Sequence, residues 1–344
     1  MNTRHMVFRI LFSCCLFFSS LFAEAQFIPA GEPVPILEYR FNETGIFAPS
    51  SGTDQVTLTL RTNNSSPFDM HSEEGGGVSG RKGDRSFDNS ASTTRSGGVA
   101  DGLPSESISG LKSMTLLGWL KSKADPLTFA PRVIESWSGP YLGGRNPGRL
   151  VFNANTNETG ATSDAYFGEI GEWFFFAVTF DGTTNTNNIH FYKGLTTSNV
   201  TLVGIFSATP GLAPSSVPYL KIGNTDTEGA NRRPFVGWID NIRIFGSKTD
   251  SGGVLNQTQL ELLRTKDVLN FSDDIRLSVS RNNNEILIRW PADPDAFALE
   301  YTTNLNSPTS WQPVEVVPTV TGDQKVVNWP ATSTHFFRLR AAIP

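Results

Sequence analysis

Paired carboxylates and activated nucleophiles are the residues whose spacing would indicate catalysis. A retaining glycosidase needs two carboxylates ~5 Å apart beside its cleft, and no predicted strand carries an E-x-D-x-x-E or E-x-x-x-E pattern. The closest pair, Glu169 and Glu172, lies in a predicted turn before Trp173. The histidines beyond residue 25 are scattered, with no G-x-S-x-G motif to suggest a serine triad: His71, His190 and His335. We therefore expect no enzymatic activity.

Asp240 is the strongest candidate for a metal ligand. It lies inside the apolar segment Phe235–Phe245, where burial of an unpaired carboxylate is costly. A calcium ion, a group of backbone amides or Arg243 would each satisfy it. Calcium takes about 6–8 oxygen ligands, and the early-strand residues that would supply them are Asn42, Glu43 and Asp88. No D-x-D-x-D-G loop is present, so no high-affinity EF-hand-like site is expected. A structural calcium ion and a purely hydrogen-bonding role for Asp240 both stay open.

Aromatic and polar residues in two predicted loops are the candidates for ligand binding. Sugar rings stack on exposed aromatic side chains and are oriented by nearby polar groups. The first loop supplies Trp137, Tyr141, Arg145 and Asn146. The second loop, 226–233, supplies Arg232 and Arg233, which would suit an acidic glycan. The alternatives are that Trp137 finishes a core strand and that both loops are only solvated turns.

The N-terminus has the pattern of a cleaved export signal. Basic residues precede the apolar run Ile10–Phe22, and Ala23-Glu24-Ala25 then provides a cleavage site before Gln26. The run is too short for a stable membrane-spanning helix, which needs about 20 residues. Cleavage would remove Cys14 and Cys15, the only cysteines, and with them any disulfide or zinc–thiolate site. A lipoprotein that uses Cys14 is the alternative.

Charge and hydropathy narrow the range of partners. The chain carries 28 Lys and Arg against 33 Asp and Glu, a net charge of −5. It has no basic run of the kind that binds a phosphate backbone, so nucleic acid is not an expected partner. No apolar segment after the leader reaches membrane-spanning length. We expect a soluble monomer that is secreted, periplasmic or displayed on the cell surface.

These candidate residues are positioned by a succession of short strands. Gly, Pro, Ser, Thr and Asn are abundant and good helix formers are sparse, which is typical of sandwiches and barrels. The clearest strands are predicted at Met114–Lys121, Trp173–Phe180 and Phe235–Phe245. The second of them is apolar on both faces, which predicts a central strand. Residues 63–102 are predicted to be long loops around one edge strand near Arg85–Asp88.

The order of these segments resembles the laminin-G-like jelly rolls of the concanavalin A-like superfamily. The resemblance covers residues 34–268 and rests on MTLLGWLK (114–121), GEWFFFAVTFDG (171–182), IHFYKG (189–194), LKIG (220–223) and FVGWIDNIRIF (235–245). A short helix follows in Leu255–Leu263, capped by Asn256 and Gln259. The resemblance implies a two-sheet antiparallel sandwich that binds glycans or proteins through edge loops or a concave face. It also implies a structural calcium at one rim, which Asp240 would support.

Residues 269–344 form a second predicted module. Six short strand patterns follow Phe271, and Asn282–Asn284 predicts a tight hairpin between the first two. This density of strands is the rough signature of an immunoglobulin-like sandwich. The segments LEYTTNL (299–305) and FFRLR (336–340) are similar to fibronectin type III-like modules. We therefore predict a leader (1–25), a jelly-roll domain (26–268) and a fibronectin type III-like domain (269–344).

The whole sequence predicts an exported, non-catalytic recognition protein that binds extracellular carbohydrate or a cell-surface partner. Two alternatives stay open, because this architecture serves lectins and hydrolases alike. One is a structural or adhesive surface protein without a small ligand, which a flat, featureless concave face would favour. The other is an atypical polysaccharide-degrading glycoside hydrolase, which an acidic pair facing the concave sheet would favour.

Overall fold

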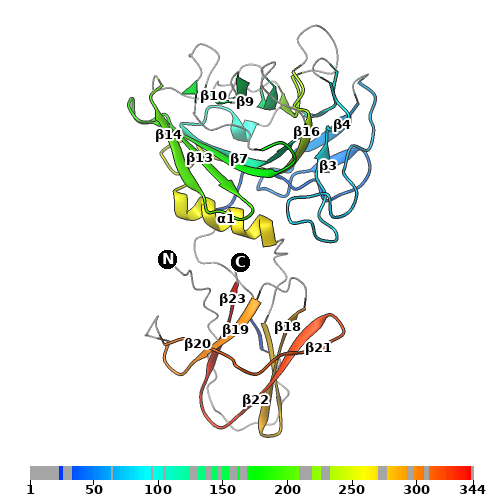
Figure 1. Ribbon diagram of the computed structural model, residues 1–344. Coiled ribbons are helices and arrows are strands. Elements are labelled where there is room, and N and C mark those ends of the chain that lie inside the picture. The colour runs from blue at the N-terminus through cyan, green and yellow to red at the C-terminus, as the bar shows by residue number, and fades with distance from the viewer. Residues whose placement is uncertain are drawn as a thin grey trace. The chain divides into compact units, whose positions relative to one another are not determined.

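Short segments of alternating and apolar residues fold the chain almost entirely into antiparallel strands, as Figure 1 shows for the computed structural model. The all-β fold is the one predicted. The strands belong to two units, Pro33–Val268 and Leu269–Pro344 with Met1–Glu32. The structure describes residues 23–25, 33–62, 65–93, 96–103, 106–123, 131–136, 141–145, 149–154, 161–162, 169–208, 219–225, 233–269, 277–292, 297–305 and 310–341.

The larger unit is a sandwich of two antiparallel sheets. One has seven strands, in the order β14 (Thr201–Phe206), β13 (Ile189–Leu195), β12 (Trp173–Asp181), β7 (Ser113–Ser122), β16 (Gly237–Ser247) and β2 (Leu37–Tyr39), with β5 (Phe87–Asp88) also paired to β16. The other has eight strands, in the order β11 (Ala161–Thr162), β10 (Arg149–Asn153), β9 (Tyr141–Arg145), β8 (Arg132–Glu135), β15 (Leu220–Ile222), β6 (Val99–Gly102), β4 (Thr57–Arg61) and β3 (Phe47–Pro49).

The inward side chains of both sheets fill the space between them. Along β12, Phe174, Phe176 and Val178 lie in this core, whereas Phe175 and Ala177 belong to a second apolar cluster on the outer face of the same sheet. The strand predicted to be central is therefore covered on both faces, as expected. In the eight-stranded sheet, alternate residues of β4 enter the core, whereas at the bulge of β8 the consecutive residues Val133 and Ile134 both do. Most of the polar side chains of this sheet lie on its other face, which points away from the core.

Helix α1 (Gln257–Leu269) packs on the outer face of the seven-stranded sheet, against β7 and β13 in Figure 1. It begins at the predicted capping box. The Asn256 N–H donates to Gln259 Oε1 at 2.9 Å, and the Gln259 N–H donates to Asn256 Oδ1 at 3.0 Å. The helix runs past its predicted end because Arg264 and Asp267, polar in sequence, are buried in ion pairs. Among the described helices, none is long and apolar enough to cross a membrane.

A buried ion network ties α1 and β2 to β16. The two Nη groups of Arg243 donate to the Asp267 carboxylate at 2.8 and 2.6 Å, and its Nε donates to Glu38 Oε1 at 2.7 Å. The indole N–H of Trp119 also donates to Asp267, at 2.9 Å. One guanidinium thus serves two carboxylates with good geometry, which is the condition for a buried ion pair to offset its desolvation.

The segment 63–102 contains more strand than its composition predicts. The expected edge strand is present as β5, but Val99–Gly102 forms β6, which lies between β4 and β15 inside the eight-stranded sheet. The prediction of loops here was wrong because VADG has neither alternation nor a run of β-branched residues. Pairing with neighbours on both sides supplies what the local sequence lacks.

The smaller unit contains two further antiparallel sheets. The first is ordered β1 (Ala23–Ala25), β17 (Leu277–Asn282), β18 (Glu285–Pro291), β22 (Gln324–Pro330) and β21 (Thr319–Thr321), and the second β20 (Gln312–Pro313), β19 (Phe297–Thr302) and β23 (Phe336–Ala341). The predicted hairpin is present, with Asn283 at its tip at a φ of 54°, which asparagine tolerates. The strand predicted at Trp311–Val317 is shorter in the structure, where it is β20. The short β1 lies within the predicted leader.

Candidate functional site

The outward side chains of the eight-stranded sheet form a continuous row. Residues directly opposite one another in a ladder point to the same face of a sheet. Successive registers link one residue from each of seven strands: Phe47, Thr59, Asp101, Lys221, Glu135, Tyr141 and Asn153. Their strand neighbours, such as Leu58 and Phe152, lie in the core. The row is therefore on the face of the sandwich opposite to α1.

Arg132 lies over the ring of Tyr141 within this row. Its Cζ is 4.1 Å from the ring centroid, in the range of a cation–π interaction. Its Nε donates to Glu135 Oε2 at 3.1 Å, and the two side chains are only 12% and 9% exposed. Arg132 and Glu135 share a face because the register shifts between Arg132 and Ile134, which marks a β-bulge. The bulge brings a ring, a guanidinium and a carboxylate together.

Arg233 is held beside Arg132. The Arg132 N–H donates to the Arg233 carbonyl at 2.8 Å, and the Arg233 N–H donates to Asn224 Oδ1 at 2.9 Å. Burial lowers the pKa of Arg132, Glu135 opposes that effect, and the charge of Arg233 lowers the pKa further. The charge of Arg233 thus acts on Arg132, and Arg132 lies over Tyr141.

The row continues with paired charges. Lys221 lies in register with Glu135 on one side and with Asp101 on the other, and its Nζ is 4.5 Å from the ring centroid of Tyr219. Asp101 accepts a hydrogen bond from Arg61 Nε at 2.8 Å. The two carboxylates of the row are thus two strand spacings apart, roughly 9–10 Å, further than the ~5 Å of a retaining glycosidase. A general acid has to hold its proton, which an arginine partner opposes.

Asn153 carries the one unsatisfied group that we find in the described row. It lies directly opposite Tyr141, and its Oδ1 is buried without a hydrogen-bond partner. Buried polar atoms are nearly always hydrogen-bonded, so an orphaned acceptor calls for a water or a ligand donor. The acceptor adjoins the aromatic end of the row.

The structure brings two of the six predicted ligand-binding residues together. Tyr141 and Arg233 both adjoin Arg132. Arg145 is the last residue of β9, opposite Arg149 in the ladder. The remaining predicted residues lie outside the described part of the chain: Trp137, Asn146 and Arg232. The residues that sequence analysis missed are Arg132, Glu135 and Lys221.

Asp240 is fully buried and satisfied by backbone amides. Its Oδ2 accepts the Val78 N–H at 2.9 Å and its Oδ1 accepts the Asn241 N–H at 2.7 Å. Arg243, another predicted partner, belongs instead to the buried ion network. Burial and the nearby charge of Asp84 raise the pKa of Asp240 well above its usual value. The arrangement is the backbone-amide alternative among those predicted.

The other predicted metal ligands mostly have protein partners of their own. Asn42 Oδ1 accepts the Arg85 N–H at 2.7 Å, and Asp88 Oδ1 accepts the Ser90 N–H at 2.9 Å. One carboxylate oxygen of Glu43 is buried without a partner. In the described part of the chain, no three His, Cys, Asp or Glu side chains are grouped to hold a metal ion. The four residues do not come together as a calcium site, and calcium binding stays a prediction.

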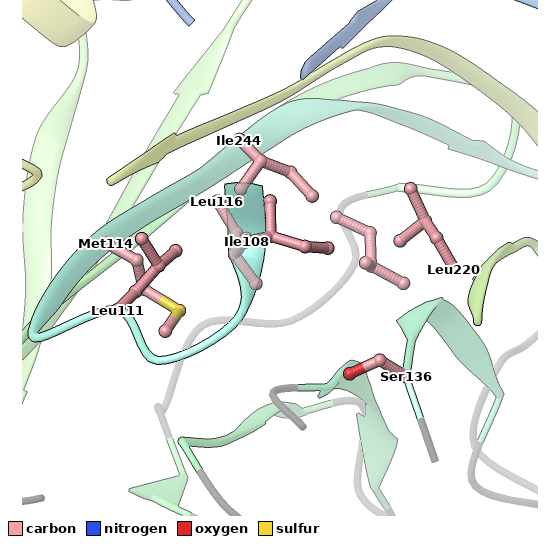
Figure 2. A pocket seen from close by; sticks show the side chains of 8 residues that line it. Ile108, Leu111, Met114, Leu116, Ser136, Leu220 and Ile244 are labelled. Atoms are coloured by element: carbon pink, nitrogen blue, oxygen red, sulfur yellow. The ribbon is translucent and has the colours of Figure 1, made fainter. Parts of the chain in front are cut away.

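A small cavity between the two sheets is too small to hold a sugar. Figure 2 shows its lining, which includes Ile108 of η1 (Glu106–Ile108), Met114 and Leu220, with Ser136 as the polar side chain. Its volume of about 10 Å³ corresponds to roughly one water molecule. This cavity is therefore not a glycan site.

The outer face of the seven-stranded sheet carries a second aromatic row. Lys121 lies in register with Trp173 and Trp238, and its Nζ is 5.9 and 5.2 Å from their ring centroids. Asp88 continues the row beside Trp238. Both indoles are half-buried. As at Tyr141, the aromatic rings here are engaged by a cation of the same chain, and this row is a second aromatic surface of the sandwich.

Comparisons with known proteins bear on the fold. No protein-family model and no curated protein matches the chain. Solved structures that resemble it include domain 4 of AbnA, a GH43 extracellular arabinanase from Geobacillus stearothermophilus, in complex with arabinotriose (TM-score 0.46, 12% identity, 68% of this chain and 100% of that chain). Others are the binding domain of botulinum neurotoxin DC in complex with SialylT (0.41, 10%, 83% and 84%) and a heptameric SAP-like pentraxin from Limulus polyphemus (0.35, 10%, 58% and 96%). These similarities leave the family of the chain unassigned.

Proposed function

We propose that the protein is an exported, non-catalytic glycan-binding protein that uses the outward face of the eight-stranded sheet. The observation that carries the proposal is the group of Tyr141, Arg132 and Glu135, at the end of a row of hydrogen-bonding side chains. An aromatic ring offers a surface for the C–H face of a sugar, and flanking donors and acceptors orient its hydroxyls. The orphaned Oδ1 of Asn153 is an acceptor that a sugar hydroxyl would satisfy.

The nearly buried ion pair favours recognition over the structural alternative. Arg132 and Glu135 are desolvated at the surface of the sheet, where apolar residues of similar volume would stabilise the fold at least as well. A sheet face that binds no ligand gains nothing from such an ion pair. A face that binds a ligand uses the pair to present charges and hydrogen-bonding groups in fixed positions.

Two further observations support a role without covalent chemistry outside the cytoplasm. Glu135 and Asp101 are each paired with an arginine and stand too far apart for a nucleophile and acid of the retaining type. The N-terminal pattern that ends at Ala25 supports export. Hydrolysis is the second candidate function, and it would be supported by the release of reducing ends from a bound polymer.

Binding of the chain from Gln26 to Pro344 to a panel of polysaccharides tests the proposal. Tyr141→Ala should weaken retention on the bound polymer by up to about tenfold, since an aromatic stack contributes about 0.5–1.5 kcal/mol. Phe68→Ala is the matched control, because Phe68 is an exposed aromatic residue outside the row. It should leave binding unchanged.

Three outcomes would contradict the proposal. Retention of no polysaccharide would remove the recognition role. Loss of binding with Trp238→Ala but not with Tyr141→Ala would move the site to the other sheet. Release of new reducing ends would replace binding with catalysis. Circular dichroism and thermal unfolding of each variant establish that a loss of binding is not a loss of fold.

A further inference from the structure

The two aromatic rows of the larger unit lie on opposite outer faces of the sandwich. The row that contains Tyr141 is on the face of the eight-stranded sheet that points away from the core. Trp173 packs against the apolar cluster that α1 covers, so the row of Trp173, Lys121 and Trp238 is on the outer face of the seven-stranded sheet. Packed sheets stand about 10 Å apart, and the core fills the space between them. One straight segment of a polysaccharide therefore cannot contact both rows.

Trp173 and Trp238 stay half-exposed where the fold buries their neighbours. Trp119, which lies two residues before Lys121 on β7, is 0% exposed and packs edge-on against Phe175, with ring centroids 5.3 Å apart. A single half-exposed tryptophan is common in folded proteins. Two of them, in register on either side of one lysine, leave a row of aromatic surface in solvent. Binding surfaces are enriched in such tryptophans, so the row has the composition of a ligand platform.

The polar groups of this row repeat the combination found at Tyr141, a ring with a cation and a carboxylate. The Lys121 ammonium lies 5.2 Å from the ring centroid of Trp238 and 5.9 Å from that of Trp173. Asp88 is in register with Trp238. An ammonium donates and a carboxylate accepts hydrogen bonds, so both can orient the hydroxyls of a sugar that contacts the rings. The row thus offers the same kinds of contact as the proposed site.

The spacing of the two indoles suits a chain of sugars better than a single sugar. Trp173 and Trp238 belong to β12 and β16, the two neighbours of β7 in the sheet. Their Cα atoms therefore stand two strand spacings apart, roughly 9–10 Å. Different sugar residues of one chain have to contact the two rings, with the hydroxyls between them within reach of Lys121. The ligand class is therefore a polysaccharide that runs across the strands.

We infer that the row of Trp173, Lys121 and Trp238 is a second polysaccharide site, and that one copy of the protein cross-links two polysaccharide chains. The inference rests on the proposed function, since Tyr141 supplies the first site. Both rows belong to one compact unit, Pro33–Val268, which holds them in fixed positions. On a surface of many chains, binding at the first site raises the effective concentration of polysaccharide at the second, which strengthens retention without any new contact.

The test counts the sites and follows cross-linking with the chain 26–344. The probes are soluble xylan, laminarin and galactan, and the hexasaccharide of whichever polymer the protein retains. Tyr141→Ala disables the first site, and Trp173→Leu/Trp238→Leu disables the second while keeping an apolar side chain at both positions. Trp238→Leu alone is a second, milder variant of the same site. Phe68→Ala is the control, because Phe68 is an exposed aromatic residue outside both rows.

Calorimetric titration of the wild type should find two hexasaccharides bound per chain, and light scattering by the polymer should rise as its chains are joined. Tyr141→Ala and both tryptophan variants should each bind one hexasaccharide and leave the light scattering of the polymer unchanged. Their retention on immobilised polymer should fall about tenfold or more, because only one site remains. Phe68→Ala should behave as wild type. Circular dichroism and thermal unfolding check that each variant keeps its fold.

Different failures separate this inference from the proposed function. One hexasaccharide per wild-type chain, lost in Tyr141→Ala, would overturn the second site and leave glycan binding at the first intact. Cross-linking that persists in both tryptophan variants would also overturn the second site. Loss of all binding in the folded tryptophan variants, with Tyr141→Ala unchanged, would leave one site on the other sheet and overturn both statements. Retention of no polymer would overturn both as well.

Discussion

Glu38→Gln is the substitution whose consequence the structure fixes most closely. Glu38 is 6% exposed on β2, and its Oε1 accepts the Arg243 Nε at 2.7 Å and lies 3.2 Å from the Arg40 Nε. Glutamine keeps the volume and removes the charge. Arg243 stays paired with Asp267 through both Nη groups, so the variant strands no buried cation. The loss of stability should therefore reflect mainly the charge of Glu38.

The size of that loss follows from the pKa of Glu38. Burial alone would raise the pKa, but the charges of Arg243 and Arg40 outweigh it and lower the pKa from 4.5 to about 2. At about 1.4 kcal/mol for each tenfold change in acidity, this corresponds to about 3 kcal/mol of folding free energy. Because the pKa is lowered in the folded state, the stabilisation is complete above pH 4.5. It disappears as the pH falls from 4.5 to about 2.

Urea unfolding followed by tryptophan fluorescence would measure the effect at neutral pH and at several values below 4.5. The larger unit of Glu38→Gln should be less stable than wild type by about 3 kcal/mol at pH 7, and the difference should narrow steadily towards pH 2. The smaller unit has its own tryptophans, such as Trp290, and its transition serves as an internal control. Glu172→Gln, an exposed glutamate, is the matched control variant. A cost below about 1 kcal/mol, or one that does not change with pH, would refute the reasoning.

Three other substitutions test local features of the fold, each by urea unfolding of the larger unit. Asn256→Ala removes half of the α1 capping box and should cost about 1 kcal/mol; an unchanged midpoint would mean that the cap contributes nothing. Trp119→Phe removes the donor to buried Asp267 and should cost about 1–3 kcal/mol, more than the change of a half-buried indole such as Trp238→Phe. Gly237→Ala places a methyl group against the Lys121 carbonyl at a φ of 153° and should cost about 2 kcal/mol or more; a smaller cost would show that β16 relaxes there.

The strands of the larger unit that were predicted correctly are those whose own residues have an apolar or alternating pattern. The double-sided apolar pattern of Trp173–Phe180 predicted a strand covered on both faces, and the structure confirms it. Val99–Gly102 was missed because its strand character comes from its neighbours β4 and β15. The end of α1 was missed for a related reason, since buried Asp267 is paired with Arg243 of β16 and buried Arg264 donates to the Leu195 carbonyl of β13.

Some residues of the candidate site can be identified from residue type alone, and others only from the pairing of the strands. Tyr141 and Arg233 were identified because an aromatic ring and an arginine in turn-rich stretches suit a sugar, and this reasoning needs no structure. Arg132, which unites them, could not be found in that way, since strict alternation would place Arg132 and Glu135 on opposite faces. The bulge that puts them on one face exists only in the pairing of β8 with β9. Deletion of the extra residue of the bulge should keep the guanidinium and its carboxylate on one face, because regular alternation places residues two positions apart on the same side of a strand.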